Sequence, residues 1–190
     1  MESVLVVSSS EKGEVRLREL LKNAAFSQID LAKNGGEARR LLNQEKSCEL
    51  VIINTPLSDE WGLDLAISLA EYSDVGVILL VKNEDADEIA HKVEDYGVFV
   101  VPKPVSRSFF YQALKLVTAS CKRLARLQSE NVKLQTKIEE MRIVNRAKYV
   151  LIEYLKMTEP QAHRYIEKQA MDLRKNRQEI AERILETYET

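Results

Sequence analysis

Residues 50–56 read LVIINTP, four consecutive apolar residues followed by two polar residues and a proline. An apolar run without polar alternation is typical of a strand that is buried on both faces, as in a parallel sheet covered by helices. Three further runs share this character, VLVV at residues 4–7, VGVILLV at 75–81 and VFVV at 98–101, and a less apolar run spans residues 27–31. We therefore predict a five-stranded parallel sheet.

Helical spacing of apolar residues separates these runs. It occurs at residues 15–21, around residues 38–42, and at residues 63–72 and 85–95. Five alternating strand and helix units predict an α/β fold, a flavodoxin-like, doubly wound parallel sheet. A functional site of such a sheet lies at the carboxyl ends of its strands.

The second half of the chain is predicted to be helical. It has no glycine after Gly97, and no proline lies between Pro104 and Pro160, so a helix that begins near Ser106 meets no stop signal. Residues at heptad a and d positions predict a dimeric coiled coil through Leu124, Leu127, Asn131, Leu134, Ile138 and Met141. An asparagine at an a position is typical of a parallel pair in which the two amides bond each other. The alternative is a helix packed along its own domain, with Asn131 exposed.

The last segment is predicted to be a three-helix unit. Its first helix covers about residues 143–156, Thr158 and Gln161 have capping-box spacing around Pro160, and Asn176 caps a third helix with Glu179 three residues on. The predicted architecture is thus a domain at residues 1–118, a coiled-coil linker helix at 119–145 and a small all-α domain at 146–190.

Composition excludes several classes of protein. The chain has 190 residues, 45% of them hydrophobic and 31% charged, and its longest apolar run of seven residues is too short to cross a bilayer. No basic segment precedes an apolar one at the start, and the two cysteines lack a disulfide or metal spacing, so we expect a cytoplasmic protein without cofactors or metals. Residues 121–190 carry 15 Lys or Arg against 11 Asp or Glu, an excess that permits nucleic-acid contact.

Residues 1–118 resemble the receiver domain of bacterial response regulators. The resemblance rests on the five units, on Asn54 after the third strand, on Gly62 eight residues later and on Lys103-Pro104 after the fifth strand. The family's chemistry needs a carboxylate nucleophile, acidic residues that hold a divalent cation, and a hydroxyl after strand four. Here Asn54 occupies the phosphoacceptor position, and only Lys103 is retained. The other departures are Ser8 and Ser9 at the metal positions, Val81 at the hydroxyl position and Val100 at the position of the switch aromatic.

These departures predict a pseudo-receiver domain without phosphotransfer. A carboxamide cannot form the acyl phosphate that an aspartate forms. Mg²⁺ prefers anionic oxygens, and Lys103 would repel it. We expect Lys103 to be structural or to donate a hydrogen bond to Asn54. The nearby acids Glu11, Asp59 and Glu60 are expected to be solvated loop charges.

The C-terminal unit resembles the ANTAR domain of bacterial transcription antiterminators over roughly residues 140–188. The residues that carry the resemblance are Ala147, Lys148, Met157, Thr158, Glu159, Ala162, Ala170, Met171, Arg174, Glu179, Ile180 and Ala181. The departures are Tyr149, where a small residue is common, and a short link at Lys175-Asn176. The resemblance implies binding of paired hairpins in the leader of an mRNA, which prevents a terminator from forming.

Basic side chains supply the candidate RNA contacts. We name Arg146, Lys148, Arg174, Lys175 and Arg177, with His163, Arg164 and Lys168 as secondary candidates. Arg174 has an alternative, structural role as an ion-pair partner of Glu179 or Glu182. The large side chains at helical spacing are expected to be core or partly buried, namely Tyr149, Tyr154, Tyr165, Met157 and Met171.

The sequence therefore predicts a dimeric RNA-binding antitermination regulator, not an enzyme, with a receiver that does not respond to phosphorylation and is controlled by a regulatory protein partner or by expression level. Two alternatives remain: a DNA-binding transcription factor, and an adaptor whose coiled coil binds proteins. The catalytic patterns that an enzyme would need, such as paired carboxylates, a glycine-rich phosphate loop or a Cys–His pair, do not occur in the sequence.

Overall fold

A five-stranded parallel sheet forms the first part of the chain. The computed structural model describes residues 3–22, 24, 26–44 and 48–188. The sheet has the order β2-β1-β3-β4-β5, which confirms the doubly wound prediction. Its strands are β1 (Ser3–Ser8), β2 (Gln28–Ala32), β3 (Leu50–Asn54), β4 (Gly76–Lys82) and β5 (Phe99–Lys103). The second strand begins one residue later than predicted, at Gln28.

Helices connect these strands as the spacing of apolar residues predicts. They are α1 (Glu11–Leu21), α2 (Gly35–Leu42), α3 (Leu63–Tyr72) and α4 (Ala86–Val93), with short 3-10 turns η1 (Asn83–Asp85) and η2 (Glu94–Tyr96) on either side of α4. Side-chain caps fix two of the helix starts. The Ser10 hydroxyl accepts the Gly13 amide, and the Asn34 side chain accepts the Glu37 amide.

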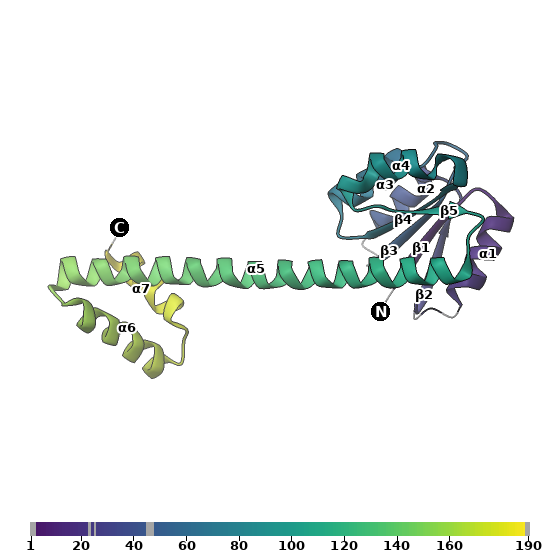
Figure 1. Ribbon diagram of the computed structural model, residues 1–190. Coiled ribbons are helices and arrows are strands. Elements are labelled where there is room, and N and C mark those ends of the chain that lie inside the picture. The colour runs from purple at the N-terminus through teal and green to yellow at the C-terminus, as the bar shows by residue number, and fades with distance from the viewer. Residues whose placement is uncertain (1–2, 23, 25, 45–47, 189–190) are drawn as a thin grey trace. The chain divides into compact units, whose positions relative to one another are not determined.

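The apolar strands are buried on both faces because helices cover both. Helices α2, α3 and α4 pack on one face of the sheet, with Ala38, Leu65 and Val93 fully buried there. Helix α1 and the start of α5 (Arg107–Leu155) pack on the other, with Phe110 in its centre (Figure 1). Alternate residues of each strand supply the two cores, which explains why the strands read as continuous apolar runs.

Helix α5 runs without interruption from Arg107 to Leu155. The helix predicted at residues 143–156 is therefore the end of this longer helix, because no proline or glycine ends it earlier. The predicted heptad residues are exposed, with 51–63% of the surface of the five apolar ones accessible: Leu124, Leu127, Leu134, Ile138 and Met141. No helix of the described residues is long and apolar enough to cross a membrane.

Contacts divide the chain into two compact units, residues 1–125 and 126–190. Residues 1–2 and 189–190, at the two ends of the chain, lie outside the described residues. The predicted limits at 118 and 145 both fall within α5.

The second unit is the predicted three-helix unit. Helix α6 (Glu159–Leu173) begins with the predicted capping box of Thr158 and Gln161, and α7 (Arg177–Tyr188) begins where Asn176 accepts the Glu179 amide at 2.7 Å. Three alanines without accessible surface, Ala147, Ala162 and Ala181, lie in the core of α5, α6 and α7. Small side chains there let the three helices approach closely.

We expect Ala162→Leu to destabilise this unit by about 1–3 kcal/mol, because the core has no room for the added atoms. Met171→Ala is the control, since Met171 is 80% exposed and its truncation removes little packing. Hydrogen exchange of the α6 and α7 amides measures the effect. Equal protection in the two variants would contradict the packing of Ala162.

Candidate functional site

Three polar side chains meet at the carboxyl edge of the sheet. The strand register sets Ser8 of β1 beside Asn54 of β3, and Lys103 ends β5. The Asn54 amide nitrogen donates to the Ser8 hydroxyl at 3.0 Å, and Lys103 Nζ donates to the Asn54 amide oxygen at 3.3 Å. Lys103 also donates to the Thr55 carbonyl oxygen. Both ends of the Asn54 amide are therefore engaged within the domain.

This arrangement does not fit a divalent cation. The Ser8 hydroxyl donates to the Ser10 carbonyl at 3.1 Å, and the Ser9 hydroxyl donates to the Pro56 carbonyl at 3.1 Å. These oxygens are neutral, whereas Mg²⁺ needs anionic ones. Burial and the neighbouring Lys82 lower the pKa of Lys103 from its usual range. An ammonium that bonds Asn54 directly would repel a metal at this place.

Gly13 of α1 closes the site from above the sheet edge. A Cβ atom added to Gly13 would lie 2.4 Å from the Asn54 amide nitrogen and 3.1 Å from the Ser8 hydroxyl. These distances are shorter than van der Waals contact, so the helix approaches the two side chains as closely as a glycine allows. No side chain larger than hydrogen fits at residue 13 without moving Asn54.

The nearby acids have structural partners rather than being merely solvated, which corrects the expectation for two of them. Asp59 accepts the Gly35 and Gly36 amides at 3.0 Å each, and these bonds lower the pKa of its carboxyl group. Glu60 forms a bidentate ion pair with Arg39 of α2, in which each carboxylate oxygen accepts a hydrogen bond from the guanidinium group. The loop after β3 is thus held to the start of α2. Val81 is fully buried and Val100 packs against the same core.

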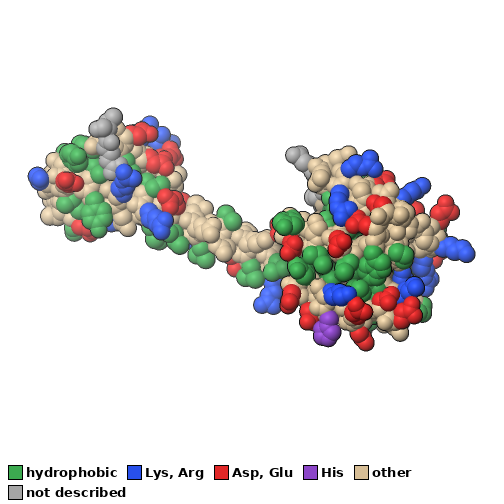
Figure 2. Space-filling view, turned by 90° about the horizontal axis from the view of Figure 1, so that it is seen from above, with side chains coloured by type: hydrophobic (Ala, Val, Ile, Leu, Met, Phe, Trp, Pro, Cys, Tyr) green, Lys and Arg blue, Asp and Glu red, His purple; other side chains and the backbone are tan. Residues whose placement is uncertain are grey.

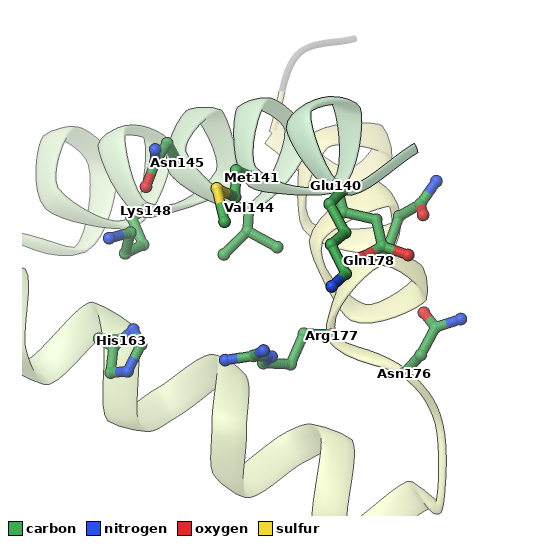
Figure 3. Close-up of a pocket in the computed structure, with 10 residues that line it drawn as sticks. Glu140, Met141, Val144, Asn145, Lys148, His163, Asn176, Arg177 and Gln178 are labelled. Atoms are coloured by element: carbon green, nitrogen blue, oxygen red, sulfur yellow. The ribbon is translucent and has the colours of Figure 1, made fainter. Parts of the chain in front are cut away.

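A second candidate site is a groove of about 530 Å³ in the C-terminal unit. We call it the link groove, because residues of the α6–α7 link form one wall. Its lining residues are Lys137, Glu140, Met141, Val144, Asn145, Lys148, His163, Asn176, Arg177 and Gln178. Val144 and Lys148 of α5 face His163 and Arg177 across it (Figure 3).

Three basic side chains of this groove, Lys148, His163 and Arg177, have acidic partners. Lys148, whose side chain is only 16% exposed, donates to Glu159 at 2.8 Å and lowers the pKa of that carboxyl group. Glu167 lies 3.3 Å from His163 and 3.7 Å from Arg177. Basic and acidic side chains accordingly alternate over the surface of this unit (Figure 2).

The other predicted RNA contacts lie outside the link groove. Arg146 is exposed on α5, and Lys175 pairs with Glu179 at 3.3 Å. Arg174 ends α6 in a left-handed conformation, with φ of 52°. In the described part of the chain it pairs with neither Glu179 nor Glu182, so its predicted alternative role as their ion-pair partner is wrong.

Several large side chains are more exposed than the sequence predicts. Tyr149 is 72% exposed and Met171 80%, so the expectation that they are core or partly buried is wrong, whereas Tyr154, 57% exposed, contacts the Tyr188 ring at 5.6 Å between centroids. Tyr149 and Met171 stand on the outer faces of their helices, where a small core has no room for them. Tyr165 is 38% exposed, whereas Met157 packs against the core as expected.

Comparison with known proteins assigns both units. The response regulator receiver domain model matches residues 4–115, and the ANTAR domain model matches residues 132–185. The chain belongs to the response regulator receiver family. It also carries an ANTAR domain at its C-terminal end. Both resemblances inferred from the sequence are thereby confirmed.

Individual relatives agree with this assignment. The transcriptional regulatory protein PdtaR of Mycobacterium tuberculosis is 28% identical over 188 residues, covering 98% of this chain and 91% of PdtaR. A signal receiver domain from Pseudomonas fluorescens Pf-5 matches 66% of this chain and 92% of its own, with 23% identity and a TM-score of 0.59. The non-phosphorylated HemR receiver domain of Leptospira biflexa matches 62% of this chain and 94% of its own, with 25% identity and a TM-score of 0.53. The chain is an ANTAR-containing, response-regulator-like transcriptional regulator, and its families are not enzyme families.

Sequence reasoning missed the acidic partners of the ANTAR cations. Glu159 and Glu167 are the carboxylates in question, and the four-residue spacing of His163 and Glu167 was a visible signal for one of them. The partnership of Lys148 and Glu159 joins two different helices, so only the fold reveals it.

In the receiver domain, we expect Gly13→Ala to cost about 1 kcal/mol of folding free energy, because the new methyl group displaces Asn54 from Ser8. In an Asn54→Ala background the same change is neutral or stabilising, since alanine favours a helix. Urea denaturation of the four proteins gives the coupling. Gly36→Ala is the matched control, because its Cβ meets only ordinary contacts at 3.5 Å or more. Additive effects at residues 13 and 54 would contradict the close approach.

Proposed function

We propose that this protein is a dimeric antitermination regulator whose ANTAR domain binds hairpins in the leader of an mRNA. The match of the ANTAR family to residues 132–185 carries the proposal. Exposed cations on α5 and at the end of α6 support it, because Arg146 and Arg174 can approach phosphates. A duplex DNA ligand is less well supported, since the two helices of a helix-turn-helix domain are joined by a turn that often contains glycine, and the link between α6 and α7 contains none.

The exposed stripe of α5 supports dimerisation. Five apolar residues at a and d positions are each more than half exposed, and Asn131 is the polar residue among them. A second copy of the helix would bury these side chains, and paired Asn131 amides would fix a parallel register. Hydrophobic atoms lie at the surface of the narrow helical segment in Figure 2. Two ANTAR domains in one dimer would hold two hairpins, which raises the overall affinity without new contacts.

The receiver domain is proposed to act without phosphotransfer. Asn54 supplies no carboxylate, its amide is bonded at both ends, and the surrounding oxygens do not fit Mg²⁺. Control of the ANTAR domain would then come from a regulatory protein partner or from the amount of protein.

We expect the protein to bind an RNA with two stem-loops at least tenfold more tightly than one with a single stem-loop, and more tightly than duplex DNA of equal length. Ile138→Lys is expected to remove the preference for two stem-loops, because a buried lysine at an a position opposes pairing. Val132→Lys is the control, at an equally exposed apolar position outside the a and d stripe. Gel shifts and analytical ultracentrifugation measure the two effects. Equal binding to duplex DNA would refute the proposed preference for RNA. A dimer that persists in Ile138→Lys would refute dimerisation through α5.

Incubation with acetyl phosphate and Mg²⁺ is expected to leave the intact mass of the protein unchanged. The physical reason is the lack of a carboxylate nucleophile at residue 54. The variant with Ser8→Asp, Ser9→Asp and Asn54→Asp supplies the missing carboxylates and is the positive control. A phosphoryl group on the unmodified protein would end the pseudo-receiver hypothesis.

A further inference from the structure

The ANTAR domain has a second groove, which we call the turn groove because the turn between α5 and α6 forms one side. It has a volume of about 560 Å³, and its lining residues are Leu155, Lys156, Met157, Gln161, Arg164, Tyr165 and Lys168. None of these seven residues is acidic. The groove thus has three cations, a tyrosine and an apolar floor.

The helical period explains this composition. Arg164 and Tyr165 lie three and four residues after Gln161, and Lys168 lies four and three residues after them, so the four side chains share one face of α6. Lys156 joins them from the turn, where its left-handed backbone, with φ of 53°, ends α5 abruptly. The side chain of Gln161 is held by the capping box, in which it accepts the Thr158 amide at 2.8 Å. Gln161 is therefore held in place at the N-terminal end of this face.

The two grooves of the domain differ in the ion pairs that their basic side chains form with carboxylates. In the link groove, Lys148 and Arg177 contact carboxylates. Among the described residues, by contrast, Lys156, Arg164 and Lys168 form no ion pair. Asp172 lies one helical turn beyond Lys168 but does not line the groove. A phosphate in the turn groove would meet cations without first having to displace an acidic side chain.

We propose that the turn groove is the subsite for the unpaired loop of the RNA hairpin. This inference rests on the proposed function and adds the surface and the part of the RNA that it binds. Lys156, Arg164 and Lys168 contact the phosphates of the loop. The ring of Tyr165, 38% exposed beside them, offers a face on which a loop base stacks.

The chemistry favours a single-stranded loop over a regular duplex. In a duplex the bases are stacked on each other, so Tyr165 would have no free base face to contact. A loop presents unstacked bases together with closely spaced phosphates. Two of the cations and the tyrosine ring lie on one face of α6, and the third cation, Lys156, lies in the adjoining turn, so the groove matches both features.

The test uses the full-length protein and a pool of RNA stem-loops with a randomised loop, compared with a blunt duplex of the same stem. We expect Arg164→Glu with Lys168→Glu to weaken binding of the stem-loop pool at least tenfold and to lower the salt dependence of the remaining affinity. Lys133→Glu with Arg183→Glu is the matched control, since it makes the same change of net charge at exposed positions that line neither groove. This control is expected to bind within about threefold of the unmodified protein.

Tyrosine variants separate stacking from charge. Tyr165→Ala is expected to lose about tenfold for stem-loops and to leave the weaker binding of the blunt duplex unchanged, because only the loop offers a base to stack. Tyr165→Phe keeps the ring and is expected to bind as the unmodified protein does. Circular dichroism of each variant checks that the domain is folded.

The outcomes distinguish the two proposals. If the unmodified protein binds the stem-loop pool and the Arg164→Glu, Lys168→Glu variant binds it equally well, the turn groove is not the subsite, although RNA binding stands. If the loss for this variant is matched by the Lys133→Glu, Arg183→Glu control, the effect is general electrostatics and the subsite is again refuted. If the unmodified protein binds no stem-loop at low salt, the proposed RNA function itself fails, and the subsite with it.

Discussion

The hydrogen bonds of Asn54 connect three elements of the receiver domain that a phosphorylated aspartate would otherwise organise. Its amide nitrogen donates to Ser8 of β1, its oxygen accepts from Lys103 of β5, and Gly13 of α1 lies against its side chain. A carboxamide is suited to this role because it donates and accepts at once, whereas an ionised carboxylate only accepts. The lysine retained from the family thus has a partner without any metal.

These hydrogen bonds bear on the proposal that the domain does not act as a phosphorylation switch. A switch needs two states with different contacts, and a ligand shifts them only by its differential affinity. Here the polar groups are satisfied within the protein, and Asp59 and Glu60 hold the adjoining loop to α2. The sheet also supports α5, whose first turns bury Phe110 and Val117 against it.

The sheet was predictable from the sequence because its apolar runs have one physical explanation, burial on both faces. The caps at Thr158 and Asn176 were predictable for a similar reason, since local hydrogen bonds depend on spacing alone. The exposure of Tyr149 and Met171 was not, because helical spacing shows that residues share a face but not which face the core covers. The partnership of Lys148 with Glu159 depends on how two helices pack, which no local pattern encodes.

The same limit applies to the RNA contacts predicted from the sequence, because the sequence shows which residues are basic but not which of them have acidic partners. A lysine or arginine adds attraction for phosphate only to the extent that its charge is not already neutralised nearby. Lys148 and Arg177 have carboxylate partners, so a phosphate must compete for them. Lys156, Arg164 and Lys168 surround a groove without acids, beside an aromatic ring. For the proposed RNA-binding function, charge pairing is thus a better guide to the contact surface than the number of basic residues, and it favours the face of α6 that begins at the α5–α6 turn.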